Sequence, residues 1–216
     1  MLTTWQPPGG SEELAIRFGD DTGPCLLVLP AWFDEGNKTR HFTIETMRLL
    51  AGRGVPSVLP DLPGCNESLT GLTEQTLATW REAAAAAAAQ FGCSQVLAIR
   101  AGANIAPGLP GFAYAPLAGK SALRALLRAR TLAAKEAGHP ETTEALLQTG
   151  KVEGLELAGY HLGAAMVAEL AEAVLAPSAL VPLDPGGPLL WLRAEPEHNP
   201  EQAAALADLI AEGMTA

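Results

Sequence analysis

The side chains that could support hydrolysis are few and widely spaced in this sequence. Nucleophilic catalysis needs a serine or cysteine within hydrogen-bond reach of a histidine, which a carboxylate in turn orients. The histidines are His41, His139, His161 and His198. The first three have no serine or cysteine at a telling distance, and His198 lies in a Pro-Glu-His-Asn-Pro turn that we expect at the exposed rim. The spacing therefore predicts no complete catalytic triad.

Three other residues are candidate nucleophiles. Cys65 has no adjacent base in the sequence, and a small buried thiol is its simpler interpretation. Ser68 and Ser121 are the least unfavourable positions for a displaced nucleophile. The sequence has no Cys-x-x-Cys pair, no His-x-x-x-His pair and no Asp/Asn-rich calcium loop. We therefore expect neither a metal nor a cofactor.

A basic segment lies between positions 120 and 136, where the single acid is Glu136. One interpretation is a solvated face that balances acidic neighbours. The other is an anion-binding crevice, in which the segment joins Arg100 and Lys38 at the carboxyl ends of parallel strands. Its basic residues are Lys120, Arg124, Arg128, Arg130 and Lys135.

The tripeptide Gly119-Lys120-Ser121 matches the end of a phosphate-binding loop. That motif needs a further glycine five residues before Gly119, where this chain has Tyr114. We therefore do not expect a nucleotide site here.

Length and composition indicate one globular domain over residues 1–216, since the chain is short for two. The net charge of -10 argues against nucleic-acid binding, which needs a basic surplus. No apolar run approaches the ~18 residues of a membrane span, and the first residues lack the pattern of a signal peptide. The three cysteines, an odd number, are typical of a reducing compartment. We expect a cytoplasmic protein with no nucleic-acid or membrane partner, and the oligomeric state stays open.

Short apolar runs bounded by glycine and proline predict the strands. The first two segments form an edge pair across the Pro-Pro-Gly-Gly turn at 7–10, and the continuous runs that follow are typical of parallel strands covered on both faces. The predicted strands are Leu2–Gln6, Ser11–Phe18, Cys25–Leu29, Val55–Leu59, Gln95–Ile99, Gly111–Ala115 and Pro188–Leu192.

Helices are predicted between these strands. The first carries Phe42 and Met47 on its apolar side and ends at Gly52 or Gly54; the next is capped by Thr73. This second helix covers 73–91, helices dominate 121–148, and further helices are predicted at 163–175 and 200–212. Alternating strands and helices predict an α/β fold of three layers, with a mostly parallel sheet between helices. Residues 117–162 could form a small helical cap.

The turn that follows the strand at 95–99 carries a family resemblance. Ala98-Ile99-Arg100-Ala101-Gly102 resembles the G-x-S-x-G turn of α/β-hydrolases, which raises a nucleophile above the sheet. The last glycine is kept, but Arg100 stands in the nucleophile's place. A guanidinium has no lone pair to attack a carbonyl and stays protonated at ordinary pH. Prolines at 107 and 110 limit the helix after the turn to about two turns.

Two further motifs extend this resemblance. Pro60–Ser68 is similar to the D-x-R/P-G-x-G-x-S turn of α/β-hydrolases, with Asn66 where glycine is usual. The loop Pro30–Arg40 occupies the place of the oxyanion loop. Its Glu-x-Asn-Lys-Thr-Arg core resembles one branch, the second type of hydrolase associated with the exosortase protein-sorting system of exopolysaccharide-making bacteria. The Arg-x-Gly-Ala turn, the stretch 116–130 and Leu157-Ala158-Gly159-Tyr160 look similar to that branch too.

The resemblance implies the hydrolase fold and leads us to expect a protein without catalysis at the turn. It would bind an anionic small molecule, or a partner in exosortase- or exopolysaccharide-linked processes. One alternative is an active esterase-type hydrolase with a displaced nucleophile. Another is that Arg100 fills the old pocket in a buried salt bridge with Glu35 or Asp61, because a buried charge needs a partner. The expected ligand-contacting residues are Trp32, Glu35, Asn37, Lys38, Arg40, Asp61, Arg100, Lys120, Arg124 and Arg128.

Overall fold

A seven-stranded sheet forms the centre of the computed structural model, which describes residues 1–20, 24–176 and 179–215. The strand order is β1-β2-β4-β3-β5-β6-β9. Strand β2 pairs antiparallel with both β1 and β4. The remaining pairings, which join β4, β3, β5, β6 and β9 in that order, are parallel. The strands are β1 (Leu2–Trp5), β2 (Glu13–Phe18), β3 (Cys25–Leu29), β4 (Ser57–Pro60), β5 (Cys93–Ile99), β6 (Gly111–Tyr114) and β9 (Leu180–Leu183). The predicted α/β fold class is confirmed.

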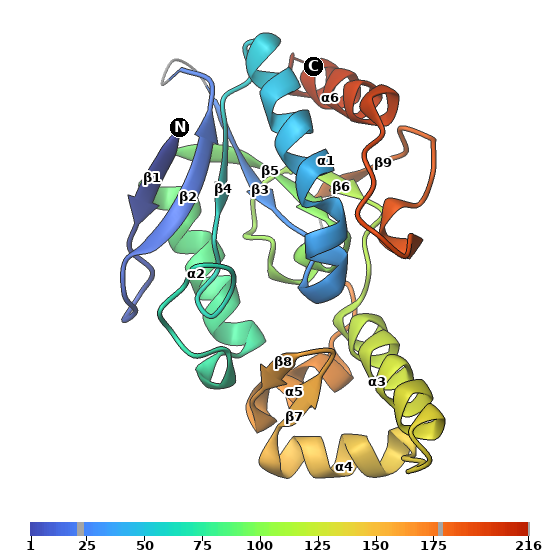
Figure 1. The fold of residues 1–216 in the computed structure, drawn as a ribbon. Coiled ribbons are helices and arrows are strands. Elements are labelled where there is room, and N and C mark those ends of the chain that lie inside the picture. The colour runs from blue at the N-terminus through green and yellow to red at the C-terminus, as the bar shows by residue number, and fades with distance from the viewer. Residues whose placement is uncertain (21–23, 177–178, 216) are drawn as a thin grey trace.

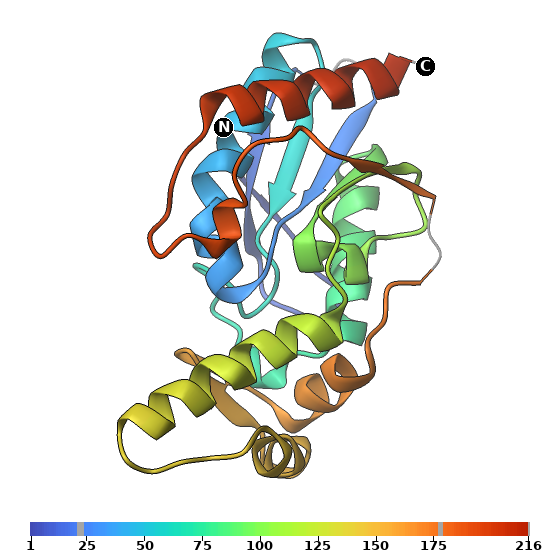
Figure 2. The same cartoon turned by 90° about the vertical axis from the view of Figure 1, so that its right-hand side faces the viewer.

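Helices cover both faces of this sheet, as Figures 1 and 2 show. Strand β3 illustrates why: its five residues are all buried, with Leu27 and Leu29 in one apolar cluster and Leu26 and Val28 in the other. Because successive side chains point to opposite faces, a continuous apolar run needs cover on both. Helix α2 (Leu77–Gln90) packs on the first face, and α1 (Phe33–Gly52) and α6 (Pro200–Thr215) pack on the second.

A smaller lobe lies below the carboxyl ends of the parallel strands (Figures 1 and 2). It contains α3 (Gly119–Glu136), α4 (Thr143–Glu153), α5 (Ala164–Glu172) and a hairpin of β7 (Leu155–Leu157) and β8 (Tyr160–Leu162). Ala158 and Gly159 form the two-residue turn of this hairpin with φ angles of 51° and 83°. Two residues with positive φ are typical of the tight turn that suits the twist of a hairpin.

The C-terminal part of the strand prediction is wrong. Residues 190–192 form a short 3-10 helix, η3 (Leu190–Leu192), and the outermost strand is β9. Strand β9 contains Pro182, which an edge strand tolerates because its outer side needs no ladder hydrogen bonds. Trp191 lies in η3, and its side chain is buried.

Two helix starts also differ from the prediction. Helix α1 begins at Phe33, so most of the expected loop Pro30–Arg40 is its first two turns. Thr73 lies in the 3-10 helix η1 (Leu72–Glu74), and Thr76 caps α2 in its place, through a capping box with Thr79. Among the described residues, no helix combines the length and apolarity that crossing a membrane requires.

Candidate functional site

The turn after β5 places Arg100 at the carboxyl edge of the sheet. Arg100 has φ of 52° and opens the six-residue 3-10 helix η2 (Arg100–Ile105). A Cβ atom on Gly102 would lie 2.6 Å from the carbonyl oxygen of Leu29, so only glycine fits there. A left-handed residue at a strand-to-helix turn is the geometry that exposes the nucleophile of an α/β-hydrolase. Arg100 thus occupies the tip of such a turn.

Asn104 fixes the shape of this turn from inside the protein. Its amide nitrogen donates to the carbonyl oxygens of Ala101 at 2.7 Å and Leu117 at 2.8 Å, and its oxygen accepts from the backbone N–H of Gly119 at 2.9 Å. The N–H of Leu117 donates to the carbonyl oxygen of Arg100 at 3.1 Å. These bonds join the turn to the start of α3. The backbone N–H of Gly119, the first of that helix, is therefore already bonded to Asn104, whereas a phosphate-binding loop would use such an N–H to bind phosphate.

The Arg100 guanidinium is bound on several sides by the protein itself. Its Nε and Nη2 donate to the two carboxylate oxygens of Glu35 at 2.9 and 3.0 Å, and Nη1 donates to the carbonyl oxygen of Ala115 at 2.8 Å. The ring of Trp191 lies 4.2 Å from the guanidinium carbon. The Arg100 side chain is 11% exposed and that of Glu35 is 24% exposed. Of the two carboxylates considered as partners, Glu35 contacts Arg100, and Asp61 contacts Arg40.

A mostly apolar cavity of about 210 Å³ lies beside this pair, and we call it the elbow cavity. Its walls come from the start of α1, from one side of α3 and from η3. The lining residues are Trp32, Phe33, Asp34, Glu35, Ala101, Ala122, Ala125, Leu126, Ala129, Ala158, Trp191 and Leu192. Apart from the acids at its edge, this cavity suits an apolar group.

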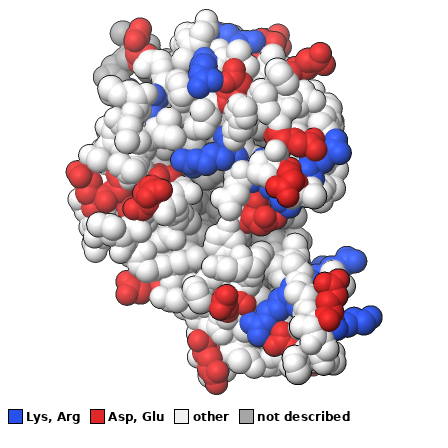
Figure 3. Space-filling view, viewed as in Figure 1, with Lys and Arg blue, Asp and Glu red and all other residues white. Residues whose placement is uncertain are grey.

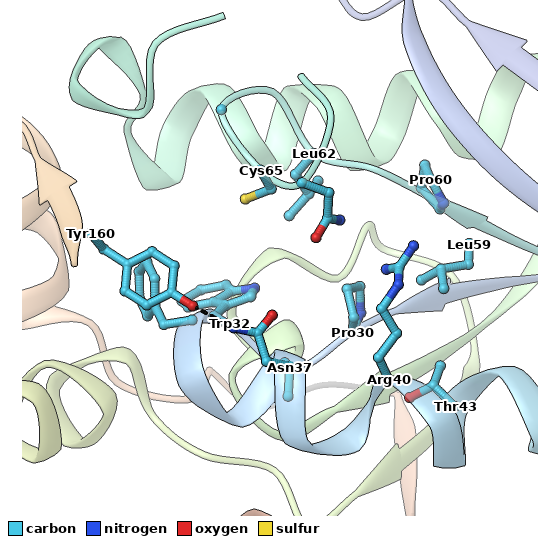
Figure 4. A pocket seen from close by; sticks show the side chains of 15 residues that line it. Pro30, Trp32, Asn37, Arg40, Thr43, Leu59, Pro60, Leu62, Cys65 and Tyr160 are labelled. Carbon is cyan, nitrogen blue, oxygen red and sulfur yellow. Dashed lines mark hydrogen bonds between the residues drawn. The ribbon is translucent and has the colours of Figure 1, made fainter. Parts of the chain in front are cut away.

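A second cavity, of about 110 Å³, lies between α1 and the loop after β4 (Figure 4), and we call it the Arg40 cavity. The amide nitrogen of Asn37 donates to the hydroxyl of Tyr160 at 2.9 Å, which closes one side of it. Nη1 of Arg40 lies 3.7 Å from Asp61 Oδ1. The lining residues are Pro30, Ala31, Trp32, Phe33, Gly36, Asn37, Arg40, Thr43, Leu59, Pro60, Leu62, Gly64, Cys65, Asn66 and Tyr160.

The loop after β4 explains how Asn66 replaces the glycine of the hydrolase motif. Asn66 has φ of 50°, in the left-handed region that asparagine tolerates better than most residues. Its side-chain amide donates to Asp61 Oδ1. Burial raises the pKa of the Asp61 carboxyl above its usual value, while Arg40 and the Asn66 hydrogen bond act in the opposite direction.

The candidate nucleophiles all lack a histidine partner within the described parts of the chain. Burial, and secondarily the charges of Asp61 and Glu13, raise the pKa of the Cys65 thiol to about 12, so this thiol is protonated at neutral pH. The hydroxyl of Ser68 donates to Glu13 at 2.7 Å and accepts from two backbone N–H groups, which is a structural role in the loop. Ser121 lies in the first turn of α3, where its backbone N–H donates to the carbonyl oxygen of Ala118 at 2.9 Å.

The histidines likewise form no pair with a serine or cysteine in the described residues. His41 and His198 stack on each other, with ring centroids 4.1 Å apart. His139 is exposed, and His161 lies in β8 with Nδ1 3.9 Å from Glu156. None of these environments prepares an imidazole to act as a base toward a nucleophile.

The structure does not bring the basic segment to Arg100. Lys120, Arg124 and Arg128 are exposed, whereas the α3 residues that line the elbow cavity lie on the opposite side of the helix. Lys38 pairs with Asp34 at 2.7 Å along α1. Figure 3 shows acidic side chains among the basic ones over the lobe.

Trp191 and Tyr160 are two aromatic residues at the site that were not predicted from the sequence as its members. Trp191 covers Arg100, but its segment was assigned to a strand. Tyr160 reaches the Arg40 cavity from the β7–β8 hairpin, where its hydroxyl meets Asn37. The sequence signal for both is a large aromatic residue shortly after a glycine-containing turn, and this signal does not show what the ring contacts.

Comparison with known proteins gives partial matches among solved structures. No family model and no curated protein matches this sequence. A proline iminopeptidase-related protein from Thermus thermophilus is 22% identical over 71% of this chain and 56% of its own, with a TM-score of 0.49. A protein from Agrobacterium vitis described as a hydrolase is 21% identical over 62% and 59%, with a TM-score of 0.46. An epoxide hydrolase from Vigna radiata is 20% identical over 49% and 33%, with a TM-score of 0.41.

This chain therefore spans between a third and three fifths of the length of those three proteins. The fold assignment rests on the chain's own sheet and on the turn at Arg100. Together they make the fold α/β-hydrolase-like.

Proposed function

We propose that this protein is a catalytically silent α/β-hydrolase-like protein that binds a ligand at the carboxyl edge of its sheet. The observation that carries the proposal is the bidentate pairing of Arg100 with Glu35 at the position where a hydrolase holds its nucleophile. The pair neutralises both charges and occupies the space where a substrate carbonyl would be attacked. Among the described residues, no hydroxyl or thiol with an adjacent base stands at that tip.

The ligand-binding part of the proposal rests on the position of the two cavities. In open α/β sheets, ligands bind at the carboxyl ends of the strands, where both cavities lie. Of the expected contact residues, we assign Trp32, Asn37 and Arg40 to the ligand. Glu35 and Arg100 form an ion pair with each other, and we assign them a structural role beside the elbow cavity, which Glu35 lines. The exposed cations of α3 face elsewhere.

The physiological context proposed here is the exosortase and exopolysaccharide machinery. Its support is the sequence resemblance at residues 35–40 and 98–103, which the fold comparisons do not address. If the proposal holds, the gene should lie beside exosortase or exopolysaccharide genes, and the protein should co-purify with one of their products. A gene in an unrelated neighbourhood, with no such partner, would remove this part.

The loss of catalysis is tested with p-nitrophenyl esters of increasing chain length and with a fluorophosphonate probe. We expect no turnover above that of buffer and no covalent labelling. Ser68→Ala and Ser121→Ala are the matched variants. Labelling or turnover that either substitution abolishes would establish the displaced-nucleophile alternative in place of this proposal.

A further inference from the structure

Two tryptophans carry a buried indole N–H without a hydrogen-bond partner among the described residues. They are Trp5, which is 1% exposed, and Trp32, which is 5% exposed. The buried indole of Trp80, by contrast, donates to the carbonyl oxygen of Pro63 at 2.9 Å. A buried donor without a partner is unfavourable, because it has lost its hydrogen bond to water. Trp32 lines the Arg40 cavity, and Figure 4 shows its nitrogen on the side that faces the hollow, whereas Trp5 lines neither cavity.

Tyr160 and Arg40 add further donors to the Arg40 cavity, whose lining also includes the acceptor oxygens of Asn37 and Asn66. The Tyr160 hydroxyl accepts from Asn37, so its own hydrogen remains available. The ion-pair contact of Arg40 is the 3.7 Å approach to Asp61, and its side chain is 37% exposed. A guanidinium has five N–H donors in a planar fork. The cavity therefore offers several hydrogen-bond donors and the positive charge of Arg40, whose contact with the Asp61 carboxylate is 3.7 Å long.

The walls around these donors are apolar and leave little room. Leu59, Leu62 and Phe33 lie between the polar groups. A volume of about 110 Å³ corresponds to roughly four water molecules at about 30 Å³ each. Such a space holds a group of four or five non-hydrogen atoms.

We propose that the Arg40 cavity binds a short carboxylate, free or at the end of a larger molecule, which accepts a hydrogen bond from the Trp32 indole and lies against the Arg40 guanidinium. The inference deepens the proposed function and rests on it, because it names the ligand class of the same edge of the sheet. A carboxylate supplies acceptors and a negative charge, which complement the Trp32 and Tyr160 donors and the Arg40 guanidinium. Its two or three carbons fill the apolar remainder.

The test is a titration of the ¹⁵N-labelled protein with sodium propionate, followed at the four indole N–H resonances, which Trp→Phe variants assign. We expect the Trp32 resonance to move saturably with an apparent Kd of about 1–10 mM, the range open to so small a ligand. The Trp5 resonance is the internal control and should stay in place, since its equally unpaired indole lies outside the cavity.

Two comparisons separate this site from non-specific binding. Arg40→Gln should weaken propionate binding by roughly tenfold or more, the loss of a charged hydrogen-bond partner. Arg48→Gln, two turns further along α1 at an exposed position, should leave it unchanged. Propionamide should bind far more weakly, and hexanoate should bind as propionate does only if the carboxylate end of a longer molecule can enter.

Each contrary result overturns the inference. An unmoved Trp32 resonance means that the indole is not a ligand donor, and an equal response to propionamide or in Arg40→Gln excludes the carboxylate class. These results do not depend on the esterase assays. Turnover there would overturn the proposed function and leave the propionate result intact, and silent propionate titrations beside absent turnover would remove the ligand class alone.

Discussion

Arg100 and Arg40 lie at the same edge of the sheet, yet the protein satisfies their charges to different degrees. Arg100 holds a bidentate carboxylate, a carbonyl oxygen and an aromatic ring, and it is 11% exposed. Arg40 has a 3.7 Å contact to Asp61 and is 37% exposed. A cation at a ligand-binding edge is available to a ligand only to the extent that its own chain leaves it unpaired. By that criterion Arg100 is part of the structure, and Arg40 is the better candidate for binding.

The largest effect that would break this comparison is the loss of Glu35. Glu35→Gln should lower the free energy of unfolding by about 2 kcal/mol, because it leaves the Arg100 charge largely buried without a counter-charge. Urea denaturation measures it. Asp34→Asn is the matched control on the same turn; Asp34 is 56% exposed and pairs with Lys38, so its change should stay within about 0.5 kcal/mol. Equal losses in the two variants would show that Arg100 does not depend on Glu35.

A smaller effect would sharpen the comparison by leaving Arg100, like Arg40, without a close carboxylate partner. Glu35→Ala removes the carboxylate and leaves a space beside the guanidinium. Added formate should then restore about 1 kcal/mol or less of the lost stability, by binding the folded state alone. Thermal unfolding with formate against chloride at equal ionic strength measures it. Wild-type protein and Asp34→Ala should gain only what formate binding in the Arg40 cavity gives, which Arg40→Gln removes in each background. A gain in either as large as that of Glu35→Ala would show that formate does not bind beside Arg100.

The sequence predicted the central part of the fold because its signals are local. The runs at 25–29 and 95–99 are apolar with little interruption, which strands covered on both faces require. The turn at Arg100 was located from five consecutive residues, Ala98–Gly102, because they resemble the G-x-S-x-G turn of α/β-hydrolases. These features depend on neighbours in the chain.

The rest depends on distant contacts that a single sequence does not encode locally. The segments 180–183 and 188–192 are both short, apolar and interrupted or preceded by proline, and only pairing with β6 makes the first a strand. Arg124 and Arg128, four residues apart, share the exposed side of α3, whereas the side that lines the elbow cavity is formed by alanines and a leucine. Glu35 was one of two partners considered for Arg100, and the helical start of α1 brings it into reach.

The smallest effect concerns Asp61, the counter-charge of Arg40. Burial raises the pKa of Asp61 above its ordinary value of 3.8, so the folded protein binds this proton more tightly than the unfolded chain does. The associated stability is present below the unfolded pKa and is lost as pH rises through the folded pKa.

Wild-type protein should therefore lose stability relative to Asp61→Asn as pH rises from about 4 to 7, by less than the loss in Glu35→Gln. Urea denaturation of both proteins across this range measures the difference. Arg40→Gln should enlarge it, because the favourable charge that lowers the pKa of Asp61 is removed. If the stability of the wild-type protein instead rises relative to that of Asp61→Asn as pH increases, Arg40 binds Asp61 as completely as Arg100 binds Glu35. Arg40 would then not be available to a ligand.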